Sequence, residues 1–127
     1  MTSIDILALL TLFQLKHFIA DYPLQNYQMV TEKGHYGKRG GIYHSLIHSA
    51  LTFTTLAFFN YFVFPIDYTV AIAIAAAEFF IHYHIDWGKM QMSRRYTPKD
   101  KSFWNWMGFD QLLHQLTYLG FAWILIG

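Results

Sequence analysis

Hydrophobic residues along the chain gather in four long stretches, and polar residues gather between them. The stretches cover residues 4–21, 43–64, 66–87 and 103–126. Crossing the hydrocarbon core of a bilayer, about 30 Å thick, takes roughly 20 residues of helix, and each stretch comes close to that length. The pattern therefore predicts an all-α integral membrane protein in which residues 1–127 form a single transmembrane domain.

The connections between the stretches predict how the helices are arranged. Pro65 separates the second stretch from the third and predicts a tight hairpin, because proline disfavours helix in the residue before it. The other two connections are polar and basic. Of the nine Lys and Arg residues, eight lie in these two connections, and the ninth, Lys16, lies beside the first of them. Four spans joined by short links predict an antiparallel four-helix bundle.

The basic residues also predict an orientation in the membrane. Loops rich in Lys and Arg stay in the cytoplasm, so both basic connections are expected there. Both termini and the hairpin at Pro65 then lie on the non-cytoplasmic side. We expect a multi-pass protein of the inner (cytoplasmic) membrane whose first partner is the lipid bilayer, and whose helix surfaces leave room for a homodimer.

Composition agrees with a membrane protein and excludes several kinds of site. Apolar residues make up 54% of the chain and charged residues 13%, a balance that is unusual for a soluble domain. The formal net charge is +1 and no long basic tract occurs, so nucleic acid is not an expected partner. The absence of cysteine excludes disulfides and thiolate ligands, so any bound metal must use nitrogen and oxygen.

Histidine and aspartate recur at a spacing that suits metal binding. Side chains four residues apart lie on the same face of a helix, where both can reach one ion. Each predicted helix contains one such pair: His17 with Asp21, His44 with His48, His82 with Asp86, and Asp110 with His114. All four pairs lie toward the predicted cytoplasmic side. The sequence therefore predicts one metal site, built from all four helices, near that face.

These eight residues exceed the four ligands of a closed tetrahedral zinc site. Two divalent ions sharing a bridging carboxylate would account for the number, as would one ion surrounded by additional aspartates. The three aspartates together with Glu78 carry a charge of about minus four, which favours two ions. Zinc is the first expectation, with manganese or iron as alternatives. A hydrogen-bonded polar layer without metal is the competing interpretation, and His35 and His84 are not expected to be ligands.

Four motifs carry a resemblance over the whole chain. They are L-x-x-L-x-H-x-x-x-D-x-x-L-Q from Leu12 to Gln25, H-x-x-x-H at His44, H-x-x-x-D-x-x-K at His82, and D-Q-x-x-H at Asp110. The chain resembles an uncharacterised family of small bacterial and phage membrane proteins, the domain of unknown function thirty-three-oh-seven. In its ligand pattern alone it is similar to membrane-bound metal-dependent hydrolases and to all-helical zinc phospholipases C.

The leading functional hypothesis is a metal-dependent hydrolase of a phosphoester at the cytoplasmic membrane face. Glu78 would position the attacking water, or would act as an outer partner of the ligands, and Lys89 with Arg94 or Arg95 would hold a small phosphorylated or lipid-linked substrate. One alternative is a divalent-metal binding or transport protein. Another is a redox protein that holds di-iron or haem.

Overall fold

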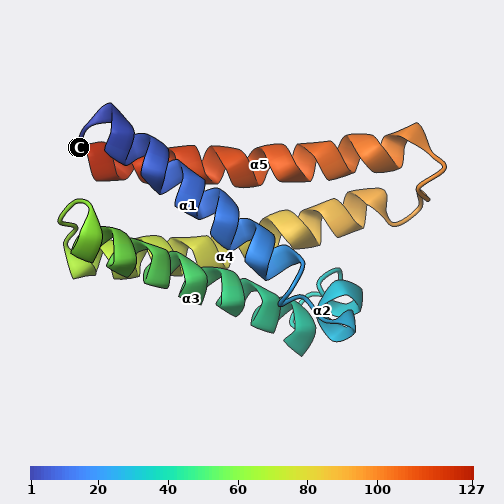
Figure 1. Cartoon of the computed structure of the whole chain (residues 1–127). Coiled ribbons are helices and arrows are strands. Elements are labelled where there is room, and N and C mark those ends of the chain that lie inside the picture. The colour runs from blue at the N-terminus through green and yellow to red at the C-terminus, as the bar shows by residue number, and fades with distance from the viewer.

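Five helices and no strands make up the computed structural model, which describes residues 1–127 (Figure 1). The all-helical prediction is confirmed. The long helices are α1 (Ser3–Asp21), α3 (Arg39–Phe62), α4 (Tyr68–Ser93) and α5 (Lys101–Ile126), and the short helix α2 (Tyr27–Glu32) lies in the connection between α1 and α3.

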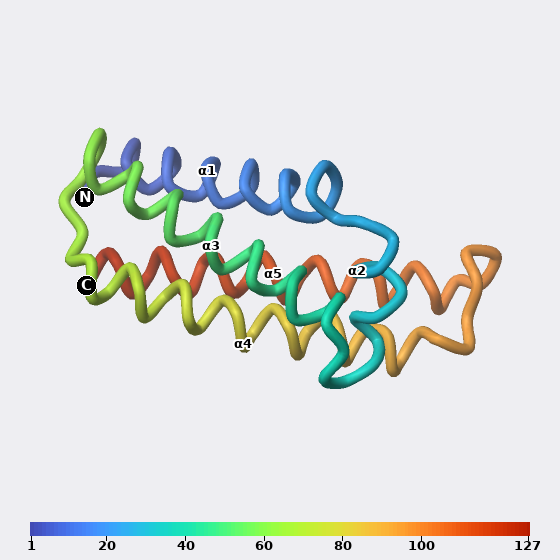
Figure 2. Tube along the Cα trace, turned by 90° about the horizontal axis from the view of Figure 1, so that it is seen from below, coloured from blue at the N-terminus to red at the C-terminus, as the bar shows by residue number.

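The four long helices form a closed antiparallel bundle. Helix α1 packs against α3 and α5, and α4 also packs against α3 and α5, so α1 and α4 lie diagonally opposite each other. Both termini and the α3–α4 turn lie at one end of the bundle, which we call the terminal end. Helix α2 and the α4–α5 connection lie at the other end, the loop end (Figures 1 and 2).

Local hydrogen bonds explain where several helices begin. Thr2 and Asp5 form a capping box at the start of α1, with Asp5 Oδ2 accepting from the Thr2 backbone N–H at 2.6 Å. Asn26 caps α2 by accepting from the Met29 N–H at 2.9 Å, and Asp67 caps α4. These caps satisfy backbone donors that a helix start leaves without partners.

The helices differ from the predicted stretches at two boundaries, and there is one additional helix. Helix α3 begins at Arg39 rather than at residue 43, α4 continues to Ser93 rather than ending at 87, and α2 was not predicted. The extensions are polar, so the hydrophobic pattern could not include them. Their consequence is that the helices project beyond the apolar stretches at the loop end.

The short helix α2 is held against the start of α3 by a close backbone approach. The Gly40 N–H donates to Glu32 Oε2 at 2.7 Å. A Cβ atom at Gly40 would collide with the backbone oxygen of Gln28, so only glycine fits here. This contact fixes the α1–α3 connection beside the buried polar residues described below.

The interior of the bundle is divided into an apolar and a polar half. Near the terminal end, the core includes Leu9, Phe13, Leu56, Phe59, Ile74, Tyr118 and Phe121. Toward the loop end, the buried side chains are polar or charged. Over the whole chain 14 buried residues are hydrophobic and 12 are polar or charged, a polar share that calls for a functional or structural explanation.

Two helices, α1 and α4, are long and apolar enough to cross a membrane. Helices α3 and α5, at 24 and 26 residues, do not meet the same test. Buried core helices of soluble proteins and N-terminal signal sequences also meet it, so the prediction of four membrane spans remains a prediction.

Candidate metal centre

Asp21, at the end of α1, lies among three imidazoles. Its Oδ2 atom is 2.9 Å from Nε2 of His17, one turn earlier on the same helix. Its Oδ1 atom is 2.8 Å from Nε2 of His48 and 3.3 Å from Nε2 of His44, both on α3. The pair predicted on α1 and the pair predicted on α3 therefore meet at one carboxylate.

Asp86 on α4 has equivalent surroundings. Its Oδ2 atom is 3.4 Å from Nε2 of His44 and 3.4 Å from Nε2 of His82. Its Oδ1 atom is 3.3 Å from Nε2 of His114 on α5. Since His44 is close to both Asp21 and Asp86, it connects the two halves of the cluster.

Asp110 completes the set at its edge, with Oδ1 3.5 Å from Nε2 of His114. All eight residues predicted to bind metal thus lie in one continuous cluster, which we call the His/Asp cluster. Two groups within it bring their ligand atoms within 4.8 Å of one another: Asp21, His44, His48 and His82, and then His82, Asp86 and His114. These buried groups could hold a metal ion.

Several atoms of the cluster are buried without a hydrogen-bond partner. They are both ring nitrogens of His44 and His82, Nε2 of His17, Oδ2 of Asp86 and Oδ1 of Asp110, whose short contacts within the cluster lack the geometry of hydrogen bonds. Leaving a buried polar group unpaired costs about 1–3 kcal/mol. A cation coordinated by these nitrogen and oxygen atoms would remove that cost, so this set of ligand atoms fits a divalent metal.

Glu78 lies on the other side of the imidazole rings. Its Oε1 atom is 3.7 Å from Nδ1 of His48 and 3.6 Å from Nδ1 of His82, whereas Nε2 of both rings faces the aspartates. Lys16 Nζ lies 2.8 Å from the same Oε1, and both side chains are buried. A carboxylate behind a histidine commonly orients the ring of a metal ligand.

Tyr118 joins this outer layer from α5. Its hydroxyl lies 2.7 Å from Nδ1 of His17 and donates to Glu78 Oε1 at 3.4 Å. Its ring stacks on Phe13 with centroids 5.3 Å apart, and Lys16 Nζ lies 4.6 Å from the centre of the ring. Tyr118 therefore connects the apolar core to the His/Asp cluster.

Sequence reasoning missed the roles of Lys16 and Tyr118. Lys16 was noted only as a basic residue beside the first connection, but it pairs with Glu78 and so neutralises a charge that was counted with the aspartates. Tyr118 continues the stripe of Asp110 and His114 at the same four-residue spacing, a signal that could have identified it.

A cavity of about 480 Å³ leads from the loop end to the His/Asp cluster, and we call it the polar cavity. Asp21, Asp86 and Asp110 line it together with Lys33, Lys89 and Arg94. Arg95 does not line it; its guanidinium lies 5.1 Å from the centre of the Tyr96 ring. The predicted cations Lys89 and Arg94 thus lie beside the predicted ligands.

Lys33, from the connection after α2, was not predicted at the site. Its Nζ lies 3.6 Å from Asp86 Oδ2. Burial alone would lower the pKa of Lys33, but the negative charges of Asp86, Asp21 and Asp110 outweigh that effect and raise its pKa. Lys33 therefore stays protonated at the mouth of the cluster.

The remaining histidines lie outside the cluster, in agreement with expectation. His35 is exposed in the connection before α3. His84 Nδ1 lies 2.7 Å from the carbonyl oxygen of Phe80, and its Nε2 lies 2.9 Å from the Tyr36 hydroxyl on the outside of the bundle.

An all-helical protein with a buried His/Asp cluster is the class that this fold and site define. Residues 9–126 match a family described as "Protein of unknown function (DUF3307)", and the chain belongs to that family. The comparisons with curated proteins and with solved structures gave no significant match.

Proposed function

We propose that the protein is a membrane-embedded, metal-dependent hydrolase of a phosphoester, with its site near the cytoplasmic face. The most direct support is that five imidazoles and three carboxylates lie together in the bundle, and several of their buried nitrogen and oxygen atoms have no hydrogen-bond partner. They lie next to a cavity lined by cations.

A membrane location is supported by the outer surface of the bundle. Large apolar side chains point outward from all four long helices, whereas charged groups are buried inside. Examples are Leu7 at 65% exposed, Phe62 at 65%, Phe80 at 61% and Trp123 at 77%. Apolar surface of this extent is unfavourable in water but favourable in lipid. With the basic connections at the loop end, we place that end in the cytoplasm and both termini on the other side.

Two divalent ions suit the arrangement better than one. Asp21 is surrounded by His17, His44 and His48, and Asp86 has equivalent surroundings on the other side of His44. Lys16 offsets Glu78 and Lys33 lies beside Asp86, so the charge left for cations is smaller than the sequence indicated, and the case for two ions rests on the two carboxylates that are each surrounded by imidazoles. Zinc is the first candidate, and manganese or iron also accept these ligands.

Ions bound in the cluster would polarise a phosphoryl oxygen and lower the pKa of a water molecule. In the hydrolysis, water oxygen bonds to phosphorus while the phosphorus–oxygen bond to the alcohol breaks, and a water proton ends on the leaving oxygen. Lys89 and Arg94 would hold the anionic phosphate in the polar cavity. Glu78 faces the backs of His48 and His82, which favours ring positioning over direct activation of water.

Metal transport is less well supported. A permeation path needs polar groups along its length. The half of the bundle near the terminal end is filled by apolar side chains, with Thr52 as its buried polar exception. The cluster therefore opens toward one end.

The test is a metal count on protein purified in mild detergent without chelators, by inductively coupled plasma mass spectrometry. Wild type is compared with an Asp21→Asn, Asp86→Asn double variant and with His35→Ala, which removes an exposed histidine outside the cluster. We expect about two divalent ions per chain in wild type and in His35→Ala, loss in the double variant, and hydrolysis of phosphoesters only where metal remains. A metal-free wild-type protein would contradict the proposal.

A further inference from the structure

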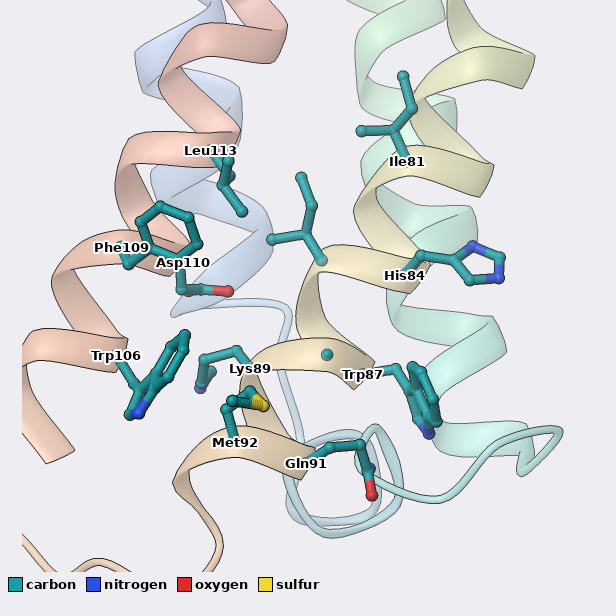
Figure 3. A pocket seen from close by; sticks show the side chains of 12 residues that line it. Ile81, His84, Trp87, Lys89, Gln91, Met92, Trp106, Phe109, Asp110 and Leu113 are labelled. Atoms are coloured by element: carbon teal, nitrogen blue, oxygen red, sulfur yellow. The ribbon is translucent and has the colours of Figure 1, made fainter. Parts of the chain in front are cut away.

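A second cavity lies between α4 and α5, on the outside of the bundle, and we call it the α4/α5 groove (Figure 3). Its volume is about 640 Å³, within the range of roughly 300–1,000 Å³ that small-molecule sites occupy. The walls are mainly apolar, with Ile81, Ile85 and Met92 on α4 and Trp106, Phe109 and Leu113 on α5.

The groove adjoins the polar cavity. Lys89 and Asp110 line both of them, so the apolar groove ends where the cation-lined cavity begins. Figure 3 shows the side chains of Lys89 and Asp110 between the two helices, with Trp106 near them. The lysines that form ion pairs within the chain are Lys16 and Lys33, which leaves the charge of Lys89 available for a ligand.

We propose that the α4/α5 groove holds a hydrocarbon chain of an anionic membrane lipid whose phosphate group lies in the polar cavity. This inference rests on the proposed function and names its substrate class: a lipid phosphoester that enters sideways from the bilayer. The apolar walls give the hydrocarbon chain of the lipid surroundings similar to the bilayer interior, and the positive charges of Lys89 and Arg94 complement the negative charge of the phosphate.

Gly88 offers a way to block the groove. It lies in the wall on α4, and a Cβ atom there would meet nothing within 4 Å, so a side chain can be added to this wall of the groove without a clash at its Cβ. Gly108 on α5 is equally open but lines neither cavity, which makes it a matched control. Replacing glycine within a helix also favours the helix in both variants.

The experiment is photo-crosslinking in phosphatidylcholine nanodiscs with a phosphatidic acid that has a diazirine in one acyl chain. Adducts are mapped by peptide mass spectrometry in wild type, Gly88→Leu and Gly108→Leu, and a diazirine phosphatidylcholine serves as the neutral-headgroup probe. We expect adducts concentrated on residues 81–92 and 106–113, several-fold fewer in Gly88→Leu, unchanged in Gly108→Leu, and weak with the neutral-headgroup probe.

Four results would overturn the inference. Adducts spread evenly over all four long helices would show ordinary lipid contact, and adducts unaffected by Gly88→Leu would place the chain elsewhere. Equal labelling by both probes would exclude recognition of the anionic headgroup. Groove residues that stay unlabelled in a protein that is dimeric in the nanodisc would assign the groove to a second copy of the chain.

The labelling needs no turnover, so the inference and the proposed function can fail separately. Groove adducts without phosphate release from any phosphoester would contradict the hydrolase while supporting the lipid site. Release of phosphate from a soluble ester without groove adducts would contradict the lipid site while supporting the hydrolase.

Discussion

Lys16 on α1 and Glu78 on α4 form a buried ion pair, 2.8 Å between Nζ and Oε1, across the diagonal of the bundle. The two helices do not pack directly, so this pair is one of the contacts that join them through the interior. Because Glu78 also faces Nδ1 of His48 and His82, the pair couples the packing of the helices to the orientation of two rings.

Removing one member of this pair should cost more than removing both. Lys16→Met leaves Glu78 buried without its cation, and such changes destabilise proteins by about 3–5 kcal/mol. Adding Glu78→Gln should recover part of the loss, because no unpaired charge then remains. Thermal unfolding of the two single variants and the double variant in detergent measures the coupling; strictly additive losses would show that the pair contributes no coupling energy.

Chelation should lower stability only where the cluster is intact. A ligand that binds the folded state at 100 times its dissociation constant stabilises it by about 2.7 kcal/mol. We therefore expect a chelator to lower the Tm of wild type and of His35→Ala, and to leave the Asp21→Asn, Asp86→Asn variant unchanged. If the chelator leaves the Tm of wild type unchanged, the cluster is better explained as a polar layer without metal.

Lys89 should act on substrate binding rather than on folding. Lys89→Met is expected to raise the KM for an anionic phosphoester about 10-fold or more, since a hydrogen bond to a charged group contributes about 1.5–3 kcal/mol. Lys101 is exposed at the start of α5 and lines neither cavity, so Lys101→Met is the control for net charge. Equal effects of both substitutions on KM would indicate general electrostatics instead of a specific contact.

Gly40 should tolerate no side chain. Gly40→Ala places a Cβ against the backbone oxygen of Gln28, and crowding of this kind costs about 1–3 kcal/mol. Gly108→Ala has open space and should stabilise its helix by up to about 1 kcal/mol. Limited proteolysis of the α1–α3 connection, which α2 and Gly40 hold in place, measures the local effect. Equal cleavage rates in both variants would contradict the close approach.

Much of the fold follows from the lengths of the apolar stretches, because each long helix contains one of them. The extension of α4 to Ser93 and the short α2 follow instead from polar residues and caps such as Asn26, which hydrophobic periodicity does not report. Whether the long helices cross a membrane depends on surroundings that a bundle alone does not determine, since only α1 and α4 meet the simple criterion.

For the site, spacing predicted which residues could share a face, and the packing of four helices then brought all four pairs together. Which ring nitrogen of a histidine faces a carboxylate depends on side-chain rotamers and on the rotation of the helices. The position of Glu78 beside Nδ1 of His48 therefore could not be derived from spacing. Lys16 was missed because a basic residue near the end of a membrane span also fits the orientation rule. Lys33 reaches Asp86 only through the shape of a connection.

The distribution of the His/Asp cluster over all four long helices also sets the order of biogenesis. His17 belongs to the first helix and Asp110 with His114 to the last, so no hairpin made during translation contains the whole set. Asp110 and His114 can therefore join the cluster only after the last helix has been made, so the complete set of eight residues forms late in folding.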